Sequence, residues 1–193
     1  MRTIRFFAAI MVLVAIALPS AGQQSAQLVP DQSAIKIKGT SNLHEWEEEV
    51  GKFKVNLNLK INENKLTSID HVHVTMQSGS IHSSNNIMTN KTHDALNVKK
   101  YPEIEFKFVS VDKLSSSGGK FSGTLVGDIT IAGVTKRISL AFSGVHTGNK
   151  VTINGTKELN MNDFKIDPPT ALMGTLKTGQ EVTISFSLNF QVT

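Results

Sequence analysis

The sequence predicts an all-β protein of antiparallel strands with one short α-helix, and three observations support this fold class. Residues 53–61 and 182–190 each alternate apolar and polar side chains, which is typical of strands with one buried and one solvated face. Each run would extend about 30 Å, the height of a tall barrel or sandwich. Residues 121–131 also alternate and place Gly123 and Gly127 on the apolar face, which suits the curvature of a closing barrel. A barrel is favoured because closure removes exposed sheet edges.

The N-terminus has the pattern of a secretory signal peptide, which we place at residues 1–22. Arg2 and Arg5 precede an apolar run over residues 6–18, and small residues follow it. The run is shorter than the roughly 20 residues of a membrane-spanning helix, and the alternative is an uncleaved anchor. Residues 23–193 would then form a single domain that is periplasmic or secreted.

The rest of the chain carries the signals of further strands and of one helix. Residues 23–32 are polar and are expected to form an extended lead-in. A helix is expected over Asn86–Leu96, because an asparagine at position 85 or 86 can cap its start and Tyr101-Pro102 marks its end. Strands are expected over residues 34–39, 53–61, 70–76, 104–108, 121–131, 138–142, 151–153 and 182–190, with an irregular or 3₁₀ turn over residues 161–166.

The composition argues against disulfides, nucleic-acid binding and a metal site. The chain has no cysteine, so an exported fold would have no disulfides, no thiolate nucleophile and no cysteine metal ligands. Without the signal, 18 basic residues face 16 acidic ones, a balance that does not suggest nucleic-acid binding. His71 and His73 share one strand face, but a metal site needs three or four ligands, so we expect neither metal nor cofactor.

The sequence also lacks the motifs of common enzymes. It contains no Gly-x-Ser-x-Gly, no phosphate-binding glycine loop and no His-Glu-x-x-His. The acidic triplet Glu47–Glu49 could supply a carboxylate, but a solvated turn is the simpler interpretation. We therefore expect no catalytic residues and no enzyme activity.

Three segments resemble the YceI-like family. Residues 123–140, GTLVGDITIAGVTKRISL, resemble its G-x-L-T-I-x-G-V-T block, and residues 101–106, YPEIEF, are similar to its Tyr-Pro block. Residues 162–166, NDFKI, lie where the family has its D-F-x-I segment. The resemblance extends over residues 33–192. It indicates a divergent branch, because residues 91–96 lack the Arg-Asp pair that many members carry.

The resemblance implies an exported, all-β, eight-stranded antiparallel lipocalin-like barrel. Its implied partner is a long-chain isoprenoid or fatty amphiphile, held in the lumen for transport or storage. The alternative is a filled barrel that acts as a structural or interaction module of the cell envelope, without a lipid ligand. An enzyme acting on a hydrophobic substrate ranks third. The resemblance is also compatible with a transient contact with a membrane and with a homodimer.

If the lumen holds a lipid, two groups of residues are expected to contact it: those that line the lumen and those at its mouth. Trp46 would suit a lipid entrance, because it joins an apolar ring to one N–H donor, although it could instead cap the barrel core. The expected head-group and mouth residues are Ser41, Asn42, His44 and His93, although a histidine such as His44 is more often a surface or hydrogen-bonded residue than a head-group contact. The expected lumen contacts are Ile37, Trp46, Phe53, Val55, Leu57, Leu59, Val72, Val74, Phe106, Phe108, Leu125, Ile129, Leu140, Phe142, Ile184, Phe186 and Leu188.

Overall fold

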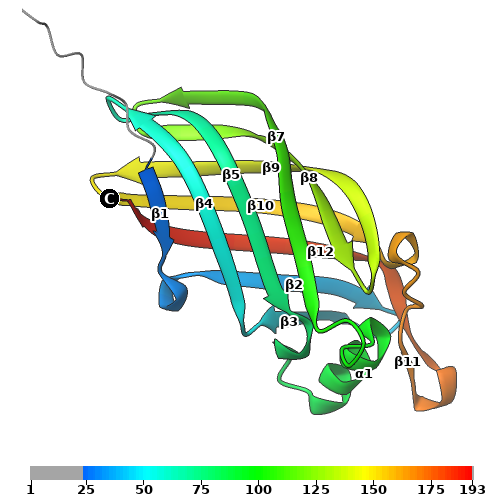
Figure 1. The fold of residues 1–193 in the computed structure, drawn as a ribbon. Helices are drawn as coiled ribbons and strands as arrows, with labels where there is room; N and C mark the ends of the chain where they lie inside the picture. Colours follow the sequence, from blue (N-terminus) through cyan, green and yellow to red (C-terminus); the bar gives the residue numbers. More distant parts are fainter. Residues whose placement is uncertain (1–23, 193) are drawn as a thin grey trace, which may run out of the picture.

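The structure, a computed structural model, describes residues 24–192 (Figure 1). The predicted signal peptide, residues 1–22, lies outside the described residues. Among the described residues, no helix is both long and apolar enough to cross a membrane. The described chain is built from β-strands, with a single α-helix, α1 (Asn86–Leu96), at one end of the sheet.

Eight of the described strands close into an antiparallel barrel, as the sequence predicted. Going round the ring, each strand pairs with the next, and the last pairs with the first. Every pairing in the ring is antiparallel. Short hairpins join four of the strand pairs. In order round the ring, the strands are β1 (Gln24–Leu28), β4 (Phe53–Asn62), β5 (Lys65–Gln77), β7 (Glu103–Ser117), β8 (Lys120–Ile131), β9 (Val134–Thr147), β10 (Lys150–Asn160) and β12 (Leu176–Val192).

The barrel is closed by β1, in a segment predicted to be an extended lead-in. Ala26 lies opposite Leu57 of β4 on one side and opposite Val192 of β12 on the other. The prediction for residues 23–32 was therefore wrong in this part, because five residues with two apolar side chains are too few to show an alternating pattern.

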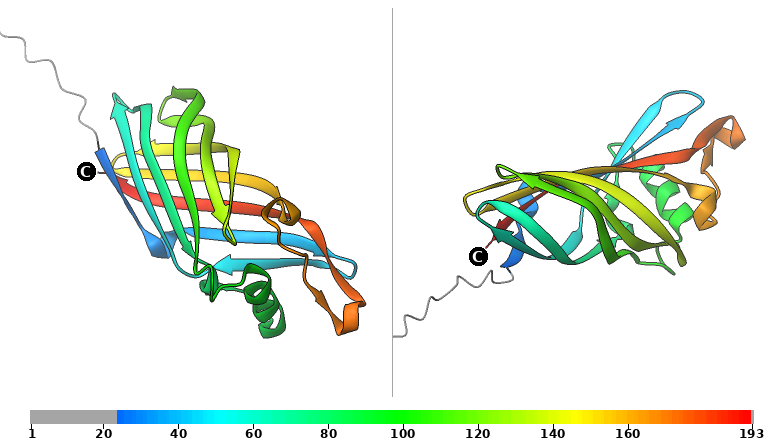
Figure 2. Two further views of the ribbon diagram at one scale, coloured as in Figure 1. Left: turned by 45° about the vertical axis from the view of Figure 1, so that its right-hand side comes forward. Right: turned by 90° about the horizontal axis from the view of Figure 1, so that it is seen from above.

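The predicted strand over residues 34–39 exists but lies beside the ring. It is β2 (Ala34–Ser41), which pairs with residues 178–187 of β12, while β1 pairs with residues 190–192 of the same strand. β3 (Glu45–Val50) and β6 (Ile81–His82) extend this wall beyond β2. Figure 2 shows the β2–β3 hairpin and the start of β12 reaching past the barrel on the side of α1.

Helix α1 has the predicted bounds. The Asn85 side chain accepts hydrogen bonds from the backbone N–H of Ile87 and of Met88, at 2.9 and 3.3 Å, which caps the first turn. Asn97 ends the helix in a left-handed conformation. The remaining short elements are the 3₁₀ turns η1 (Pro30–Gln32), η2 (Ser78–Ser80), η3 (Met161–Phe164) and η4 (Leu172–Gly174), and the two-residue strand β11 (Thr170–Ala171); η3 lies within the predicted turn.

The glycines of β8 make room for aromatic rings of the neighbouring strands. A Cβ at Gly127 would clash with the ring of Phe106, and one at Gly123 would lie 2.9 Å from Cζ of Phe142. Phe106 and Phe142 are both buried in the core. The bare backbone of β8 therefore lets large rings lie flat against the barrel wall, which complements the curvature inferred from the sequence.

Candidate functional site

The interior of the barrel contains two adjoining apolar cavities. The outer cavity has a volume of about 240 Å³ and the inner one about 100 Å³. Both are far larger than the roughly 15 Å³ that admits one water molecule. Four side chains line both cavities and mark the boundary between them: Ile35, Met76, Leu159 and Ile184. The described barrel is therefore not completely filled by its own side chains.

The inner cavity lies within the ring of eight strands. Its lining is apolar apart from Lys157, and its residues come from both sides of the barrel. Most of the lumen contacts expected from the sequence lie here. They are Val55, Leu57, Val72, Val74, Phe106, Leu125, Ile129, Leu140, Phe142, Ile184, Phe186 and Leu188.

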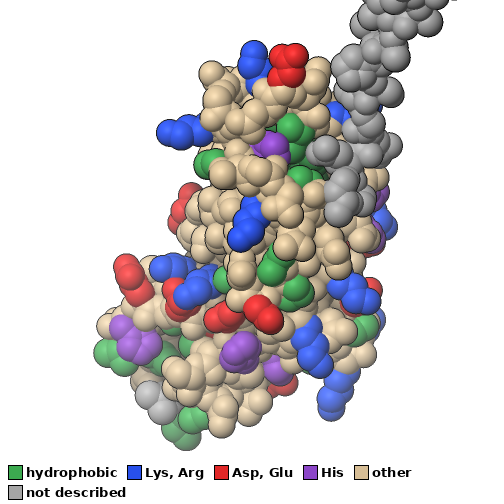
Figure 3. Space-filling model, turned by 90° about the vertical axis from the view of Figure 1, so that its left-hand side faces the viewer, with side chains coloured by type: hydrophobic (Ala, Val, Ile, Leu, Met, Phe, Trp, Pro, Cys, Tyr) green, Lys and Arg blue, Asp and Glu red, His purple; other side chains and the backbone are tan. Residues whose placement is uncertain are grey.

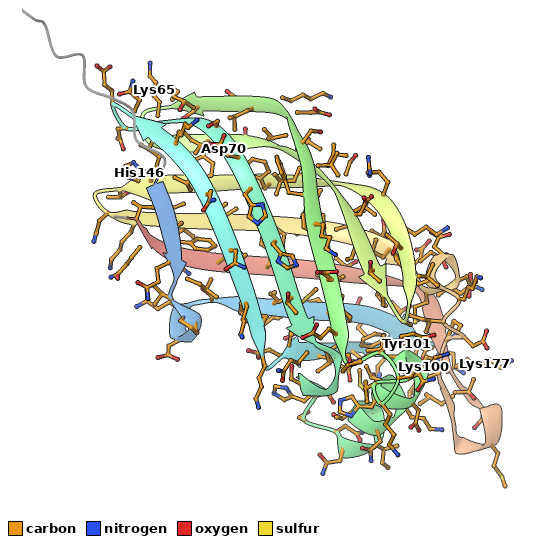
Figure 4. All side chains as sticks on the ribbon, in the orientation of Figure 1. Lys65, Asp70, Lys100, Tyr101, His146 and Lys177 are labelled. Atoms are coloured by element: carbon orange, nitrogen blue, oxygen red, sulfur yellow. The ribbon has the colours of Figure 1, made fainter. Side chains whose placement is uncertain are left out.

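The end of the barrel away from α1 is closed. Leu59 and Val151 are wholly buried there, and Asn64 Oδ1 lies 2.7 Å from Nδ1 of His146 across two turns. Figure 4 places His146 and Lys65 at this end and Lys177 at the other. The lumen therefore opens at the α1 end.

The outer cavity forms the mouth, between the β2–β3 hairpin, α1, η3 and the start of β12. It is lined by Ile37 and Trp46, which were expected as lumen contacts, and by Ser41 and His44, which were expected at the mouth. The Trp46 ring lies over Gly39 of β2, where a Cβ would clash with it, and its N–H donates to the carbonyl oxygen of Thr40 at 3.0 Å. Trp46 is therefore a fixed part of the mouth wall.

Five residues expected at the site line neither cavity. The Asn42 amide donates to the Thr175 carbonyl at 2.8 Å and accepts from the Lys177 N–H at 2.9 Å, which ties the hairpin to the start of β12. His93 Nε2 bonds the carbonyl oxygen of Ile81 at 2.8 Å and ties α1 to β6. Leu59 is buried at the closed end, and Phe53 and Phe108 pack half-buried against the core.

Sequence reasoning missed Glu48, the most unusual side chain of the mouth. It was expected in a solvated turn, but β3 turns Trp46, Glu48 and Val50 toward the interior, and only 2% of Glu48 is exposed. Thr92 of α1 donates a hydrogen bond to Glu48 Oε2 at 2.8 Å. The even-numbered alternation in β3 was the available signal, but three consecutive glutamates concealed it.

Burial raises the pKa of the Glu48 carboxyl above its ordinary value. The hydrogen bond from Thr92 and the nearby His93 and His82 oppose this shift, but burial dominates. The second carboxyl oxygen, Oε1, is buried without a hydrogen-bond partner. The mouth therefore contains an acidic group with unused hydrogen-bonding capacity.

The two histidines of β5 lie away from the cavities. His73 Nε2 is 2.7 Å from Glu105 Oε1, and Lys107 Nζ is 2.8 Å from the other oxygen of Glu105. Hydrogen bonds from Lys107 and then His73 lower the pKa of Glu105. Within residues 24–192, no group of three or more His, Cys, Asp or Glu side chains is arranged to hold a metal ion. His73 therefore belongs to a surface hydrogen-bond network with Glu105 and Lys107.

Curated proteins similar to this chain are UPF0312 proteins of Pseudomonas. One from Pseudomonas putida (strain W619) is 38% identical over 89 residues, which cover 43% of this chain and 44% of the relative. One from Pseudomonas syringae pv. syringae (strain B728a) is 37% identical over 99 residues, 48% of this chain and 47% of the relative. The chain thus spans less than half of the length of these relatives.

Solved structures share the fold at low sequence identity. BcnA of Burkholderia cenocepacia has a TM-score of 0.66 and 18% identity, over 84% of this chain and 99% of BcnA. A polyisoprenoid binding domain from Saccharophagus degradans, implicated in plant cell wall breakdown, has a TM-score of 0.63 and 10% identity, over 88% of this chain and 98% of that domain. The YCEI protein of Campylobacter jejuni has a TM-score of 0.61 and 18% identity, over 74% of this chain and 82% of that protein.

The family itself is shown by a longer match. The model of the YceI-like domain matches residues 27–190, which include six of the eight ring strands in full, most of β12 and the last two residues of β1. The match also includes every residue that lines the two cavities. The chain belongs to the YceI-like family.

Proposed function

We propose that the protein is an exported binding protein that holds a long-chain isoprenoid or a similar amphiphilic lipid in its lumen, for transport or storage. The observation that carries this proposal is the pair of adjoining apolar cavities, of which the outer one is lined by residues of α1 and of the β2–β3 hairpin. Apolar surface buried in such a lumen stabilises a bound chain by roughly 25 cal/mol per Å². The fold neighbour described as a polyisoprenoid binding domain supports the same class of ligand.

The lining of the inner cavity favours binding over catalysis. The inner cavity is apolar around its wall, and its one ionisable residue is Lys157. General acid-base catalysis needs titratable groups within hydrogen-bond reach of a reacting atom. An apolar wall supplies burial and shape instead, as a carrier requires.

A membrane surface is the proposed source and destination of the lipid. Three exposed apolar side chains surround the mouth: Leu43 at the hairpin tip (72% exposed), Ile87 at the start of α1 (67% exposed) and Met173 in η4 (fully exposed). Figure 3 shows hydrophobic side chains at the surface of this lower end of the molecule. Such a rim can enter the interfacial region of a bilayer and place the lumen next to lipid chains.

The proposed route to that membrane is export by residues 1–22. Processing is tested by N-terminal sequencing of protein recovered from the expression host, which should start near residue 23. Retention of the full N-terminus in the recovered protein would contradict a cleaved signal. The homodimer expected from the sequence is a separate prediction, which light scattering after size-exclusion chromatography tests.

Mass spectrometry of organic extracts from natively purified protein tests the carrier function directly. A long-chain amphiphile should co-purify with the wild type. Leu140→Trp places a large ring in the inner cavity and should lower its occupancy, whereas Ser139→Trp, on the outer face of the same strand, should not.

The same variant distinguishes a lumen from a filled barrel. In a filled core, the added ring of Leu140→Trp would cost about 1–3 kcal/mol of stability through overpacking. In a lumen, the ring should be accommodated at a smaller cost. A large loss of stability together with no co-purified amphiphile in the wild type would favour the filled structural module.

A further inference from the structure

Glu48 places a carboxyl group in the apolar mouth of the lumen. Its neighbours on the same face of β3 are Trp46 and Val50, which also line the outer cavity. The flanking Glu47 points the other way and pairs with Lys36 and Lys38 at 2.7 and 3.1 Å on the outside of the wall. The inward position of Glu48 therefore follows from strand alternation.

One oxygen of this carboxyl is already satisfied. Thr92 Oγ1 donates to Oε2 at 2.8 Å, which fixes the carboxyl plane between β3 and α1. The other oxygen, Oε1, is buried and has no partner among the described residues. A buried polar group without a partner costs free energy, and a ligand group that pairs with it recovers that cost on binding.

We propose that Glu48 receives the polar end of the lipid and that this end is an uncharged hydroxyl, so that the ligand is a long-chain alcohol. This inference rests on the proposed carrier function and specifies its ligand. A hydroxyl both donates and accepts, so it pairs with Oε1 whether or not the carboxyl is protonated. The apolar chain would extend past Ile35 and Met76 into the inner cavity, away from Glu48.

An anionic head group fits this position less well. A phosphate carries a charge of about −1.5 to −2 at neutral pH and would lie beside an acidic side chain in an apolar wall. The positive group that lines the same cavity, Lys91, is exposed at the rim, whereas Glu48 is buried in the wall. His82 and His93 lie near Glu48, and their ring nitrogens contact the backbone carbonyl oxygens of Ser80 and Ile81.

Delipidated protein and three probes of equal chain length test the proposal: geranylgeraniol, its monophosphate and the corresponding hydrocarbon. The wild type should bind the alcohol at least about fivefold more tightly than either of the others, the effect of one hydrogen bond to an otherwise unpaired group. Glu48→Met, an apolar side chain of similar length, should bind the alcohol and the hydrocarbon equally. Glu48→Gln keeps a donor and an acceptor and should retain the preference.

Glu49→Gln is the matched control, because Glu49 lies on the exposed face of the same strand. This substitution should leave the affinities for all three probes unchanged. Equal binding of alcohol and hydrocarbon by the wild type, tighter binding of the phosphate, or a preference that survives in Glu48→Met would overturn the head-group assignment and leave the carrier function standing. Binding of none of the three probes would overturn the carrier function itself.

Discussion

At the scale of single residues, the mouth contains a buried carboxyl group, that of Glu48, with one oxygen that has no hydrogen-bond partner among the described residues. An isolated charge in an apolar wall is unfavourable, which raises the pKa of this carboxyl in the folded state. Natural proteins tolerate such groups mainly at functional sites, where a ligand or partner uses them. The unliganded protein should therefore be less stable than its strand pairing alone would allow.

Glu48 gives a prediction for the pH dependence of stability. Because the pKa of Glu48 is raised in the folded state, the unfolded state loses this proton first as pH rises above about 4.5. The free energy of unfolding of the wild type should therefore fall with rising pH relative to that of Glu48→Gln, which cannot ionise. Below about pH 4.5, the difference in the free energy of unfolding between the two proteins should disappear. Urea denaturation of both proteins across this range measures it, and parallel pH profiles would contradict a buried, ionisable Glu48.

At the scale of elements, the two sequence blocks that resemble the family meet in space. The turn after β8 contains Gly133 in a left-handed conformation, with φ of 78°. A Cβ there would lie 2.5 Å from the ring of Tyr101, which follows α1, and Lys100 Nζ lies 5.0 Å from the centre of that ring. Figure 4 labels Lys100 and Tyr101 at the α1 end. The Gly-Val-Thr block thus supplies the surface on which the Tyr-Pro block rests.

Gly133→Ala should reveal this contact. The substitution imposes both an unfavourable backbone conformation and a clash with Tyr101, so we expect a loss of about 2–3 kcal/mol in the free energy of unfolding. Gly148→Ala is the matched control, because φ there is 62° but nothing lies within 4 Å of the added Cβ. The control should cost only about 1 kcal/mol. Equal losses in urea denaturation would show that the Tyr101 contact contributes nothing.

The elements also show how far the sequence predicts the structure. Alternation located the long strands and capping located α1, because both signals are local and repeat over many residues. The sequence pattern missed β1, because the pairing of this strand depends on two distant strands. It also misplaced Glu48, because the burial of this side chain depends on the packing of α1 against β3. Most of the residues expected to contact a ligand line the cavities, because strand faces are periodic. Asn42 and His93 do not line them, because their side chains bond to distant backbone groups.

At the scale of the whole molecule, the two ends of the barrel have different surfaces. The mouth has exposed apolar side chains around an apolar cavity, whereas the opposite end is closed by turns. This difference between the two ends implies that lipid exchange depends on which end approaches a membrane.

The difference between the two ends predicts that the apolar rim of the mouth affects the rate of lipid transfer to a membrane. Replacing both Leu43 and Met173 with Ser should slow the transfer of a fluorescent long-chain alcohol from the protein to phospholipid vesicles several-fold, because each exposed apolar side chain contributes to contact with the bilayer interface. Val145→Ser is the control, since Val145 is 43% exposed but lies near the closed end. Unchanged transfer in the double variant, or equal slowing in the control, would exclude the rim as the membrane contact.

The pairing of β1 with β12 has a consequence for how the lumen arises. Ala26 lies opposite Val192, so closing the ring joins the first and the last described strands of the chain. Bringing such distant segments together costs loop-closure entropy and is typically slow compared with the formation of hairpins. Hairpins between sequence neighbours can form early, but they make an open sheet without an interior. We therefore expect the enclosed lumen to arise late in folding, when the five residues of β1 complete the wall.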